Sequence, residues 1–504
     1  MTRIVDLAAA NQLMGHVFRA QGRINGLQVQ VSSGQVSQDY AGIARDSGRL
    51  VRLENTRDLH QRFVANNQTM DLKLKSTETT LASIRKTIQD FRFALLDYAS
   101  GATDDRTKVA AIQDAAFKSL IGLQGLLNTE VDGSHLLAGS RVTTRPVDFG
   151  LTTLAAFQAQ VDGEAVTVPT TREAHLAGLT LGHAATGNLT FDETASTISA
   201  STVNAFANVP VGATITVGGT GSNNGNFTVT ENTGTMLTIR SVRLGLDQPT
   251  VTTAVLSAPG DITLDHADTG DLTFNAANGT VEAATPGSLA AIPVGSAFTV
   301  SGAAPANNGT YTVASNTGNV ITIRQTILTD ETPAPVAATI ELAPWFRGDT
   351  VARGHRVDAE QSFALDLTAV DPAFEKAIRA MKLIAQGTFG SAGGLDQNPE
   401  RIGQAIWLLN SAVDRSVDGT PPFGPERPGN LAAVEMQVGL NRVLIDEANE
   451  RFRKFIGFLD ARVAEIENID PTEAITRLFD QAQALEASLT TMARIRQLSL
   501  VRFL

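Results

Sequence analysis

Three ligand-type residues lie close together in the sequence, at Asp265, His266 and Asp268. Carboxylate oxygens and an imidazole nitrogen at this spacing could bind a divalent cation. The same stretch occurs earlier in the chain, where the histidine recurs as His183 without either carboxylate. A metal site present in only one of two copies is the weaker interpretation. We therefore expect a surface loop here.

Other reactive constellations are missing from the sequence. It contains no HExxH, GxxxxGK[ST] or GxSxG motif, the patterns of zinc proteases, phosphate-binding loops and serine hydrolases. It also contains no cysteine, which excludes disulfides, thiolate metal sites and a cysteine nucleophile. We predict no catalytic residue, no cofactor and no metal.

The charge balance is acidic. The chain has 40 Lys and Arg against 52 Asp and Glu, a formal net charge of −12, and no run rich in Lys and Arg. Nucleic acid and anionic membranes are therefore poor partners. No apolar run approaches the roughly 18 residues of a membrane span, and the first eleven residues lack the apolar core of a signal peptide. We predict no nucleic-acid partner and no membrane insertion.

Lysine usage divides the 504 residues into three parts. Lys118 is followed by 257 residues without lysine before Lys376. This middle part consists of short alternating runs of Thr, Val, Ala, Gly and Asn, a pattern typical of strands and turns. Both flanks are rich in Lys, Arg, Glu and Gln, which favours long helices. The length suits about three domains.

The helical flanks carry apolar stripes whose members are alternately three and four residues apart. Such stripes favour lengthwise helix pairing in a left-handed supercoil, and an ordinary helical bundle in one globule is the alternative. Two stripes lie near the ends of the chain, so we expect them to be covered by each other or by other copies of the chain. The stripes are Leu13, Val17, Ala20, Ile24, Leu27 and Val31; Leu74, Thr77, Leu81, Ile84, Ile88, Phe91, Leu95 and Tyr98; and Ile475, Leu478, Ala482, Leu485, Leu489 and Met492.

A tandem repeat occupies the middle of the chain. LTLGHAATGNLTF at 179–191 recurs as ITLDHADTGDLTF at 262–274, an offset of 83, and the likeness continues through NTGTMLTIR and NTGNVITIR. We predict two copies of one small β-domain, each a sandwich or a barrel. Asn-Gly pairs at 224–225 and 308–309 predict tight hairpin turns, because both residue types accept positive φ angles.

Three segments resemble the flagellin superfamily. LQVQVSSGQVSQDYAGIA at 27–44 is similar to its N-terminal signature, in which a helix runs into a Ser-Ser-Gly or Ser-Thr-Gly turn and a loop leading to Ala-Gly. Here QVSQDY replaces the usual Asn/Asp-rich loop. Residues 471–504, with ALEAS at 484–488, resemble the closing helix of the family. TEVDGSHLLAGSRVTTRPVDF at 129–149 and the Leu-Ser-Leu and Phe-Leu ending are similar to the hook–filament junction branch, the third hook-associated protein.

The resemblance implies a structural subunit of the bacterial flagellum that polymerises through its terminal helices, at the hook–filament junction or in the filament, and serves motility. The implied partners are copies of itself in a helical or ring assembly, other flagellar axial proteins (hook-associated proteins and flagellin) and an export chaperone. The implied location is extracellular, reached by flagellar type III export without a cleaved signal peptide. A major filament flagellin and a surface adhesin whose β repeats bind a ligand are alternatives, and an enzyme is not expected.

The predicted fold is a multidomain α+β protein. A long antiparallel helical coiled-coil core is built from both termini, and tandem all-β domains are inserted into it. The predicted parts are an N-terminal core helix (1–45), a helical rod segment (46–150), a connector (151–178), two β repeats (179–260 and 261–345), a returning rod segment (346–459) and a C-terminal core helix (460–504). The predicted polymerisation interface consists of Leu13, Val17, Ile24, Leu27, Val31, Ile475, Leu478, Leu485, Leu489, Met492, Leu498, Leu500 and Leu504.

Overall fold

The computed structural model is an α+β protein with long helices at both termini. It describes residues 2–101, 103–161, 166–220, 223–241, 248–251, 255–258, 262–294, 297–324, 339–342, 344–414, 417 and 419–501. The chain divides into two compact units. Unit 1 comprises Met1–Asp71, Arg356–Gln361 and Val443–Leu504, and unit 2 comprises Leu72–His355 and Ser362–Arg442. Among the described residues, none of the helices has the length and apolarity that crossing a membrane requires.

Helix boundaries coincide with local stop and start signals. The first helix ends before Gly34, whose φ of +73° suits glycine. Asp105 begins another helix by accepting hydrogen bonds from the backbone of Thr107 and Lys108. A proline-rich connector at 421–429 separates two further helices. The helices are α1 Thr2–Ser33, α2 Ser47–Ala99, α3 Arg106–Leu127, α4 Leu154–Gln160, α5 Arg172–Leu176, α6 His183–Thr186, α7 His266–Thr269, α8 Pro372–Ala385, α9 Glu400–Val413, α10 Leu431–Glu467 and α11 Pro471–Val501.

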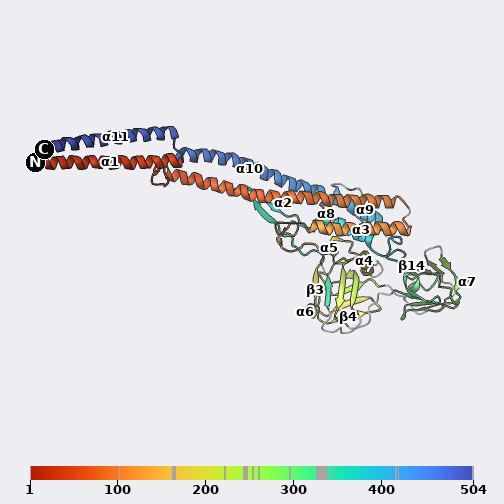
Figure 1. Ribbon diagram of the computed structural model, residues 1–504. Coiled ribbons are helices and arrows are strands. Elements are labelled where there is room, and N and C mark those ends of the chain that lie inside the picture. Colours follow the sequence, from red (N-terminus) through yellow and green to blue (C-terminus); the bar gives the residue numbers. More distant parts are fainter. Residues whose placement is uncertain are drawn as a thin grey trace. The chain divides into compact units, whose positions relative to one another are not determined.

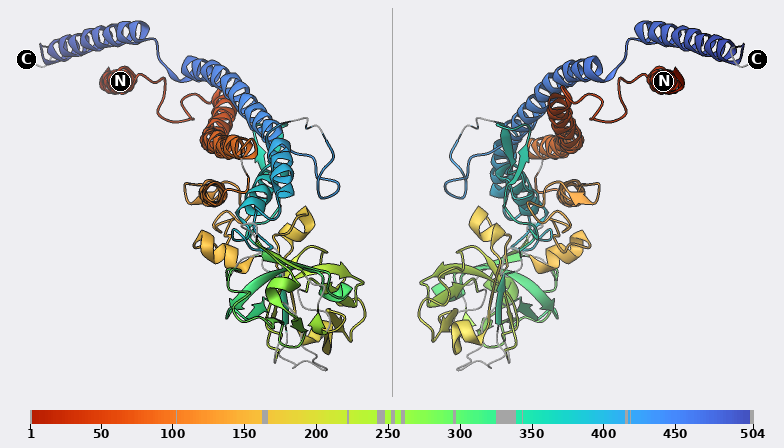
Figure 2. Two further views of the ribbon diagram at one scale, coloured as in Figure 1. Left: turned by 90° about the vertical axis from the view of Figure 1, so that its right-hand side faces the viewer. Right: turned by 90° about the vertical axis from the view of Figure 1, so that its left-hand side faces the viewer.

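The stripe predicted on α2 is buried along its whole length. All eight of its residues, from Leu74 to Tyr98, are buried in unit 2. Helix α10 runs beside α2 (Figures 1 and 2), and ion pairs join the two helices. Arg85 donates to both carboxylate oxygens of Glu435 at 2.8 and 2.7 Å, and Arg442 contacts Glu78 at 2.7 Å. The register of these pairs makes α2 and α10 antiparallel.

Helix α8 forms the centre of the helical part of unit 2. It packs against α3 and α9, and nearly all of its residues are buried, charged ones included. Its N-terminus is capped by Asp371, which accepts a hydrogen bond from the backbone of Ala373 at 2.9 Å. The charged side chains of a helix buried in this way need partners within the protein.

Two antiparallel sheets with matching strands complete unit 2. The strand order is β3-β17-β6-β7-β8-β5-β4 in sheet 1 and β11-β10-β14-β15-β16-β13-β12-β9 in sheet 2. Sheet 1 consists of β3 Leu179–Leu181, β4 Leu189–Asp192, β5 Thr197–Ala200, β6 Thr214–Gly218, β7 Gly225–Asn232, β8 Met236–Ile239 and β17 Thr339–Leu342. Sheet 2 consists of β9 Gln248–Val251, β10 Val255–Ala258, β11 Ile262–Leu264, β12 Leu272–Asn275, β13 Thr280–Ala283, β14 Ala297–Ser301, β15 Gly309–Asn316 and β16 Val320–Ile323. Two small hairpins are β1 Glu130–Val131 with β2 Ser134–His135, and β18 Arg353–Arg356 with β19 Ser362–Leu365.

Each large sheet bends at one long strand. The first half of β7 pairs with β6 and the second half with β8, with a register shift between Val229 and Glu231. Strand β15 joins β14 and β16 in the same way, with a shift between Val313 and Ser315. The two halves of sheet 1 enclose one core, which contains Ile215 from one half and Phe191 from the other. The bend therefore gives each sheet a sandwich-like interior.

The chain enters and leaves sheet 1 at the same place. Strands β3 and β17 are antiparallel neighbours, with Leu179 opposite Leu342. Just before β3, Gly178 lies so close to Pro344 that a Cβ would fall 2.7 Å from the proline Cγ. Residues on either side of the β repeats are therefore adjacent in space.

The prediction of tight Asn-Gly turns was wrong in its geometry. Strands β6 and β7 do pair as antiparallel neighbours, but β6 ends at Gly218 and Gly225 already belongs to β7. The Asn224 side chain accepts a hydrogen bond from the backbone of Thr220 at 2.9 Å and so stabilises the loop internally. In the second repeat Asn308 has a φ of −73°. Asparagine therefore acts here through its side chain and not through a left-handed backbone.

The carboxylates considered as metal ligands cap a short helix. Asp265 accepts a hydrogen bond from the backbone of Ala267 at 2.8 Å, and Asp268 accepts one from the backbone of Asp265 at 3.2 Å. This is a capping box at the start of α7. No group of three or more metal-ligating side chains occurs in the part of the chain that the structure describes.

Candidate assembly interface

The two ends of the chain are joined in unit 1 by paired backbone segments. Val36 donates its backbone N–H to Glu467 at 2.7 Å, and Ile469 donates to Gly34 at 3.0 Å. Gln35 and Asn468 form an antiparallel bridge between these bonds. From this point α1 and α11 pack against each other, with both termini at the same end of the pair (Figure 1). The terminal helices are therefore antiparallel partners.

On α1, the predicted stripe faces the interior of unit 1. Val17 is 7% exposed, and Ile24, Leu27 and Val31 are half-buried. The side chain of Leu13 lies outside the described residues. Apolar side chains that remain half-buried contribute only part of the roughly 1.5–3 kcal/mol that full burial provides. This face of α1 is therefore covered incompletely within one chain.

On α11, the buried stripe differs from the predicted one by one position at three of its members. Ile475 is 41% exposed and Leu489 45% exposed, and Ala482 is exposed as well. Their places on the inner face are taken by the preceding residues. Among the α11 side chains that the structure describes, the least exposed are Ala474, Leu478, Gln481, Leu485, Ser488 and Met492.

The observed and predicted stripes both alternate spacings of three and four residues, so spacing alone does not choose between them. At 474 and 488 the inner residue is smaller than the predicted one, whereas at 481 it is larger, because Gln481 takes the place of Ala482. The two stripes therefore differ by a rotation of α11 about its own axis, by roughly 50° at 100° per residue. Leu498 and Leu500 belong to the end of α11, and their side chains lie outside the described residues. Leu504 lies outside the described residues altogether. The role of all thirteen residues in polymerisation stays a prediction.

Large apolar side chains project from one side of the terminal pair. Phe18 on α1 is 65% exposed and Phe479 on α11 is 70% exposed. At 100° per residue, each lies about 140° from the inner stripe of its own helix in the same rotational sense. Because antiparallel helices turn in opposite senses when viewed from one end, both phenylalanines lie on the same side of the pair. We call this set the outer flank; its members are Met14, Phe18, Val29, Ile475, Phe479 and Leu489.

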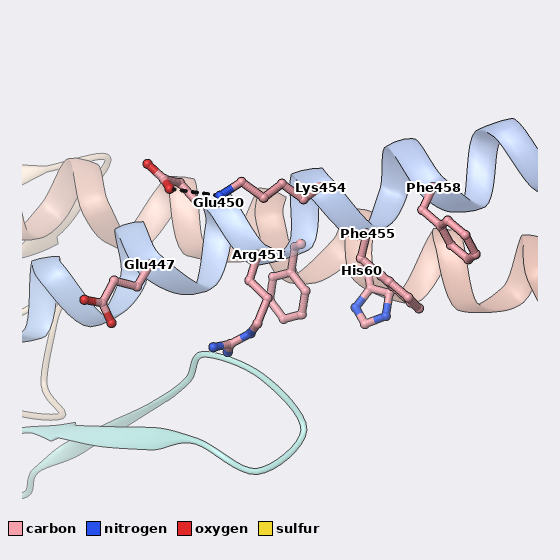
Figure 3. Close-up of a pocket in the computed structure, with 8 residues that line it drawn as sticks. His60, Glu447, Glu450, Arg451, Lys454, Phe455 and Phe458 are labelled. Atoms are coloured by element: carbon pink, nitrogen blue, oxygen red, sulfur yellow. Dashed lines mark ion pairs between the residues drawn. The ribbon is translucent and has the colours of Figure 1, made fainter.

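Unit 1 also contains a shallow aromatic groove of about 660 Å³ (Figure 3). His60 of α2 lies 4.9 Å from the ring of Phe452 and 5.2 Å from that of Phe455. Partial burial lowers the pKa of His60. Phe455 and Phe458 remain 42% and 51% exposed. Charged residues edge the groove, among them Glu447, Glu450, Arg451 and Lys454, with Glu450 and Lys454 paired at 3.7 Å.

The groove is held by contacts below its aromatic floor. Phe63 stacks on Phe452 with ring centroids 5.5 Å apart. Arg451 reaches Asp358 in the loop between β18 and β19 at 2.7 Å. Asn67 is fully buried and donates to the backbone of Val357 at 3.1 Å and to Asn449 at 3.2 Å. These bonds fix the loop to α2 and α10, so the exposed rings sit on a rigid base.

A cluster of buried charges lies in unit 2, centred on α8. Glu375 and Arg379 have fully buried side chains and are 3.0 Å apart. Arg379 also donates to both carboxylate oxygens of Glu426, at 2.8 Å each, and His175 of α5 binds Glu375 at 2.8 Å. Lys382 contacts the other ring nitrogen of His175 at 3.1 Å. This cluster ties α5 and the 421–429 connector to α8.

Burial and charge set the protonation of the cluster. Burial, aided by the positive charge of Lys382, lowers the pKa of His175 to about 4. Burial likewise lowers the pKa of Lys382 to about 8. Burial alone would raise the pKa of Glu375, but the bond from His175 and the charge of Arg379 hold it at about 2. Near pH 7, neutral His175 therefore donates from Nδ1 to anionic Glu375 and accepts from the Lys382 ammonium at Nε2.

Acid is expected to destabilise unit 2 through His175. Because the pKa of its side chain is about 4 in the folded protein and 6.5 for an unperturbed histidine, the unfolded chain takes up the proton first as pH falls. Stability is thus lost between pH 6.5 and pH 4, by about 3 kcal/mol at the lower limit. Glu375 adds a loss in the same direction below pH 4.5.

Trp345 can report this loss, since its ring lies 5.3 Å from that of His175. Trp407→Phe leaves Trp345 as the single tryptophan. Urea unfolding followed by its fluorescence at pH 7, 5.5 and 4 measures the effect. His175→Gln in the same background should flatten the profile between pH 6.5 and 4.5. An unchanged profile in that variant would contradict the assignment.

Sequence patterns did not identify the buried cluster. Glu375 and Arg379 are four residues apart, the ordinary spacing of an exposed helical ion pair. The charged residues of α8, Glu375, Lys376, Arg379 and Lys382, also lie on one face, as they do on an ordinary surface helix. His175 and Glu426 are remote in sequence and are brought to α8 by the fold.

Comparisons with known proteins find similarity among solved structures. No protein-family model matches the chain, and no curated protein does so. Among solved structures, flagellar hook-associated protein 3 from Legionella pneumophila is similar at 10% identity, over 83% of this chain and 98% of its own, with a TM-score of 0.29. The flagellar junction protein FlgL from Legionella pneumophila is similar at 12% identity, over 79% and 99%, with a TM-score of 0.26. FlgL from Xanthomonas campestris is similar at 10% identity, over 87% and 99%, with a TM-score of 0.21. At such TM-scores the function has to be inferred from this chain's own residues and contacts.

Proposed function

We propose that this chain is a structural subunit of the bacterial flagellum that polymerises through its terminal helices. The two segments with the strongest sequence resemblance, 27–44 and 471–504, include the end of α1, the turn after it and all of α11. These are the elements that pair in unit 1. The segments that resemble the flagellin superfamily are therefore the same segments that pair within unit 1.

The outer flank is the observation that carries this proposal. An exposed phenylalanine on each terminal helix, on one side of the pair, is a liability for an isolated chain and a contact for an assembled one. Burying either ring against a neighbouring copy would contribute about 1.5–3 kcal/mol. Assembly thus buries apolar surface that one chain leaves exposed.

In the proposed assembly, the outer flank of one copy contacts a different surface of its neighbour. A heterologous contact of this type, repeated, closes into a ring or extends as a helical tube. Both outcomes suit a flagellar axial protein, as a ring of junction subunits or as a filament. The aromatic groove at Phe455 and Phe458 offers a second exposed surface in unit 1 for such a neighbour. Copy number per flagellum separates the two roles, since a junction needs a ring of copies and a filament needs thousands.

Phe479→Ser tests the proposal directly. Losing the burial of one phenylalanine should raise the critical concentration for assembly about 10- to 100-fold. The monomer should keep its unfolding curve, because Phe479 is already 70% exposed. Sedimentation of assembled protein over a concentration series gives the critical concentration.

Thr491→Ala is the matched control. Thr491 is exposed on the same helix, about 120° round from Phe479 and on the other flank of the pair. This substitution should leave the critical concentration within about twofold of the unsubstituted protein. Equal effects of the two substitutions would refute the outer flank as an assembly contact.

In the proposed role the partners are other copies of the chain, the hook-associated proteins and flagellin, with an export chaperone before assembly. The protein acts outside the cell, after type III export without a cleaved signal peptide, and it serves motility. The proposal includes the coiled-coil pairing of the terminal helices. It also includes two tandem β-domains inserted between the N-terminal and C-terminal helical segments. The described contacts support it through the antiparallel α1–α11 pair and the two matching sheets.

A further inference from the structure

The two large sheets share a strand order, and comparing them shows that the two repeats exchange their last strands. Each strand of repeat 1 from β3 to β8 has a counterpart 83 or 84 residues later, from β11 to β16. In sheet 1 the place between β3 and β6 is filled by β17, and in sheet 2 the place between β11 and β14 is filled by β10. Strands β17 and β10 therefore occupy the same position in their sheets.

Their pairing registers agree residue by residue. In sheet 1, Ile340 of β17 lies opposite Leu181 on one side and Val217 on the other. In sheet 2, Leu256 of β10 lies opposite Leu264 and Val300. Each member of the second set follows its counterpart in repeat 1 by 83 residues, and Leu256 precedes Ile340 by 84. The two strands are structural equivalents.

Chain order assigns each strand to the other repeat. Strands β9 and β10 follow β8, so β10 is the last strand of repeat 1. Both belong to sheet 2, where β9 lies at the edge beside β12 and β10 fills the place between β11 and β14. Strand β17 follows β16, so it is the last strand of repeat 2, yet it completes sheet 1. The exchange is therefore reciprocal: the last strand of repeat 2 lies in sheet 1, and the last strand of repeat 1 lies in sheet 2.

We propose that the space between β3 and β6 is an acceptor site for the last strand of another repeat, and that a second copy of this chain can fill it with its own β17. The partner is an extended segment with the pairing register of residues 339–342. This inference does not depend on the flagellar role.

The chemistry of the site favours such capture. A strand between two others satisfies N–H and C=O groups on both neighbours, and an empty site would leave them unpaired beside a core. The flanking strands contribute Leu181, Ile215 and Val217, which are at most 7% exposed with β17 in place. An empty site would expose this apolar surface. The site should therefore always be filled, from within the chain or from a neighbour.

The donor strand follows a long connection in the sequence. Fourteen residues, 325–338, connect the described end of repeat 2 to β17. Fully extended, a connection of that length spans roughly 45 Å. A second copy presents the same strand with the same register, because the site already accepts a strand from a different repeat. Strand capture of this kind is a known mode of recognition at sheet edges and gaps.

The absence of cysteine from the sequence makes disulfide trapping in the full chain direct. The variant L181C/I340C places two thiols on paired residues, whose Cα separation of about 4.5–5.5 Å suits a disulfide. Mild oxidation of the monomer should consume both thiols and give one intrachain cross-link. The variant T180C/E341C uses the adjacent residue pair and tests the same cross-link if L181C/I340C folds poorly. The variant L181C/L256C tests closure by the repeat's own strand and should give no cross-link.

Exchange between copies is tested by mixing single variants. L181C and I340C proteins, refolded together from denaturant at high concentration and then oxidised, should give a covalent dimer. L181C refolded with V203C measures random cross-linking, because Val203 is 77% exposed and lies outside the strands. The dimer yield should be several-fold above this control.

Two results would overturn the proposal. A cross-link in L181C/L256C in place of L181C/I340C would mean that each repeat closes with its own strand. A cross-linked L181C/I340C monomer with no dimer above the V203C control would mean that β17 is not supplied between copies. Mass spectrometry of the joined peptides identifies the residues in either case.

Discussion

Deletion of residues 471–504 is expected to abolish polymerisation while unit 2 stays folded. The deletion removes α11, and with it both the cover of the α1 inner stripe and half of the outer flank. Val17, now 7% exposed, would face water together with its half-buried neighbours. No substitute for this surface remains on the terminal part of the chain. Sedimentation and electron microscopy of the truncated protein should show neither rings nor tubes.

A point substitution distinguishes the effect of disrupting the α1–α11 pair from the effect of removing the whole segment. Leu485→Asp places a charge on the inner face of α11, where desolvation without a partner costs several kcal/mol. It should prevent assembly as completely as the deletion does. Unfolding of Trp345, in the Trp407→Phe background, should be unaltered in both proteins. A truncated chain that still formed tubes would exclude terminal pairing as the route to assembly.

Glu375→Gln is expected to destabilise unit 2 by about 3–5 kcal/mol, the loss typical when one partner of a buried ion pair is removed. The substitution keeps the shape of the side chain but removes the charge that faces Arg379 and His175. Glu426 alone then neutralises a cluster that still contains Arg379 and Lys382. Urea unfolding at pH 7, monitored by Trp345, gives the difference in free energy.

Asp90→Asn is the matched control for this loss. Lys86 and Asp90 are paired at 2.7 Å, as short as the buried contacts, but their side chains are 75% and 62% exposed. Solvent screening makes such a pair contribute at most about 0.5 kcal/mol. A loss below about 1 kcal/mol in Glu375→Gln would contradict a structural role for the cluster.

The long helices were predictable because their apolar spacing is unambiguous. On α2 a large side chain stands at almost every third or fourth position, and all eight residues of the stripe are buried. On α11 the same reasoning chose Ile475, Ala482 and Leu489, whereas the inner face uses Ala474, Gln481 and Ser488. Both sets alternate spacings of three and four residues and differ by a rotation of the helix about its axis. Contacts with the partner helix decide that rotation, and a local pattern does not contain them.

The remaining features depend on contacts between distant parts of the chain. The offset of 83 residues predicts two similar β units, but it does not say which sheet receives the last strand of each. Strand β10 is near β8 in sequence and pairs in the other sheet. The buried cluster similarly joins His175 to Glu375, 200 residues later. Periodicity carries no information on either arrangement.

The adjacency of Gly178 and Pro344 bears on how this chain could change in evolution. The segment between them leaves and returns through two neighbouring strands, so it can lengthen, shorten or be replaced without altering the separation of the flanking residues. Because β10 and β17 occupy equivalent positions with matching registers, a chain with a single repeat retains a last strand that fits its own sheet. Loss or gain of a repeat therefore changes which strand closes each sheet and leaves the junction at Gly178 and Pro344 intact. The number of β repeats should accordingly vary in evolution without any change in the helical part of the chain.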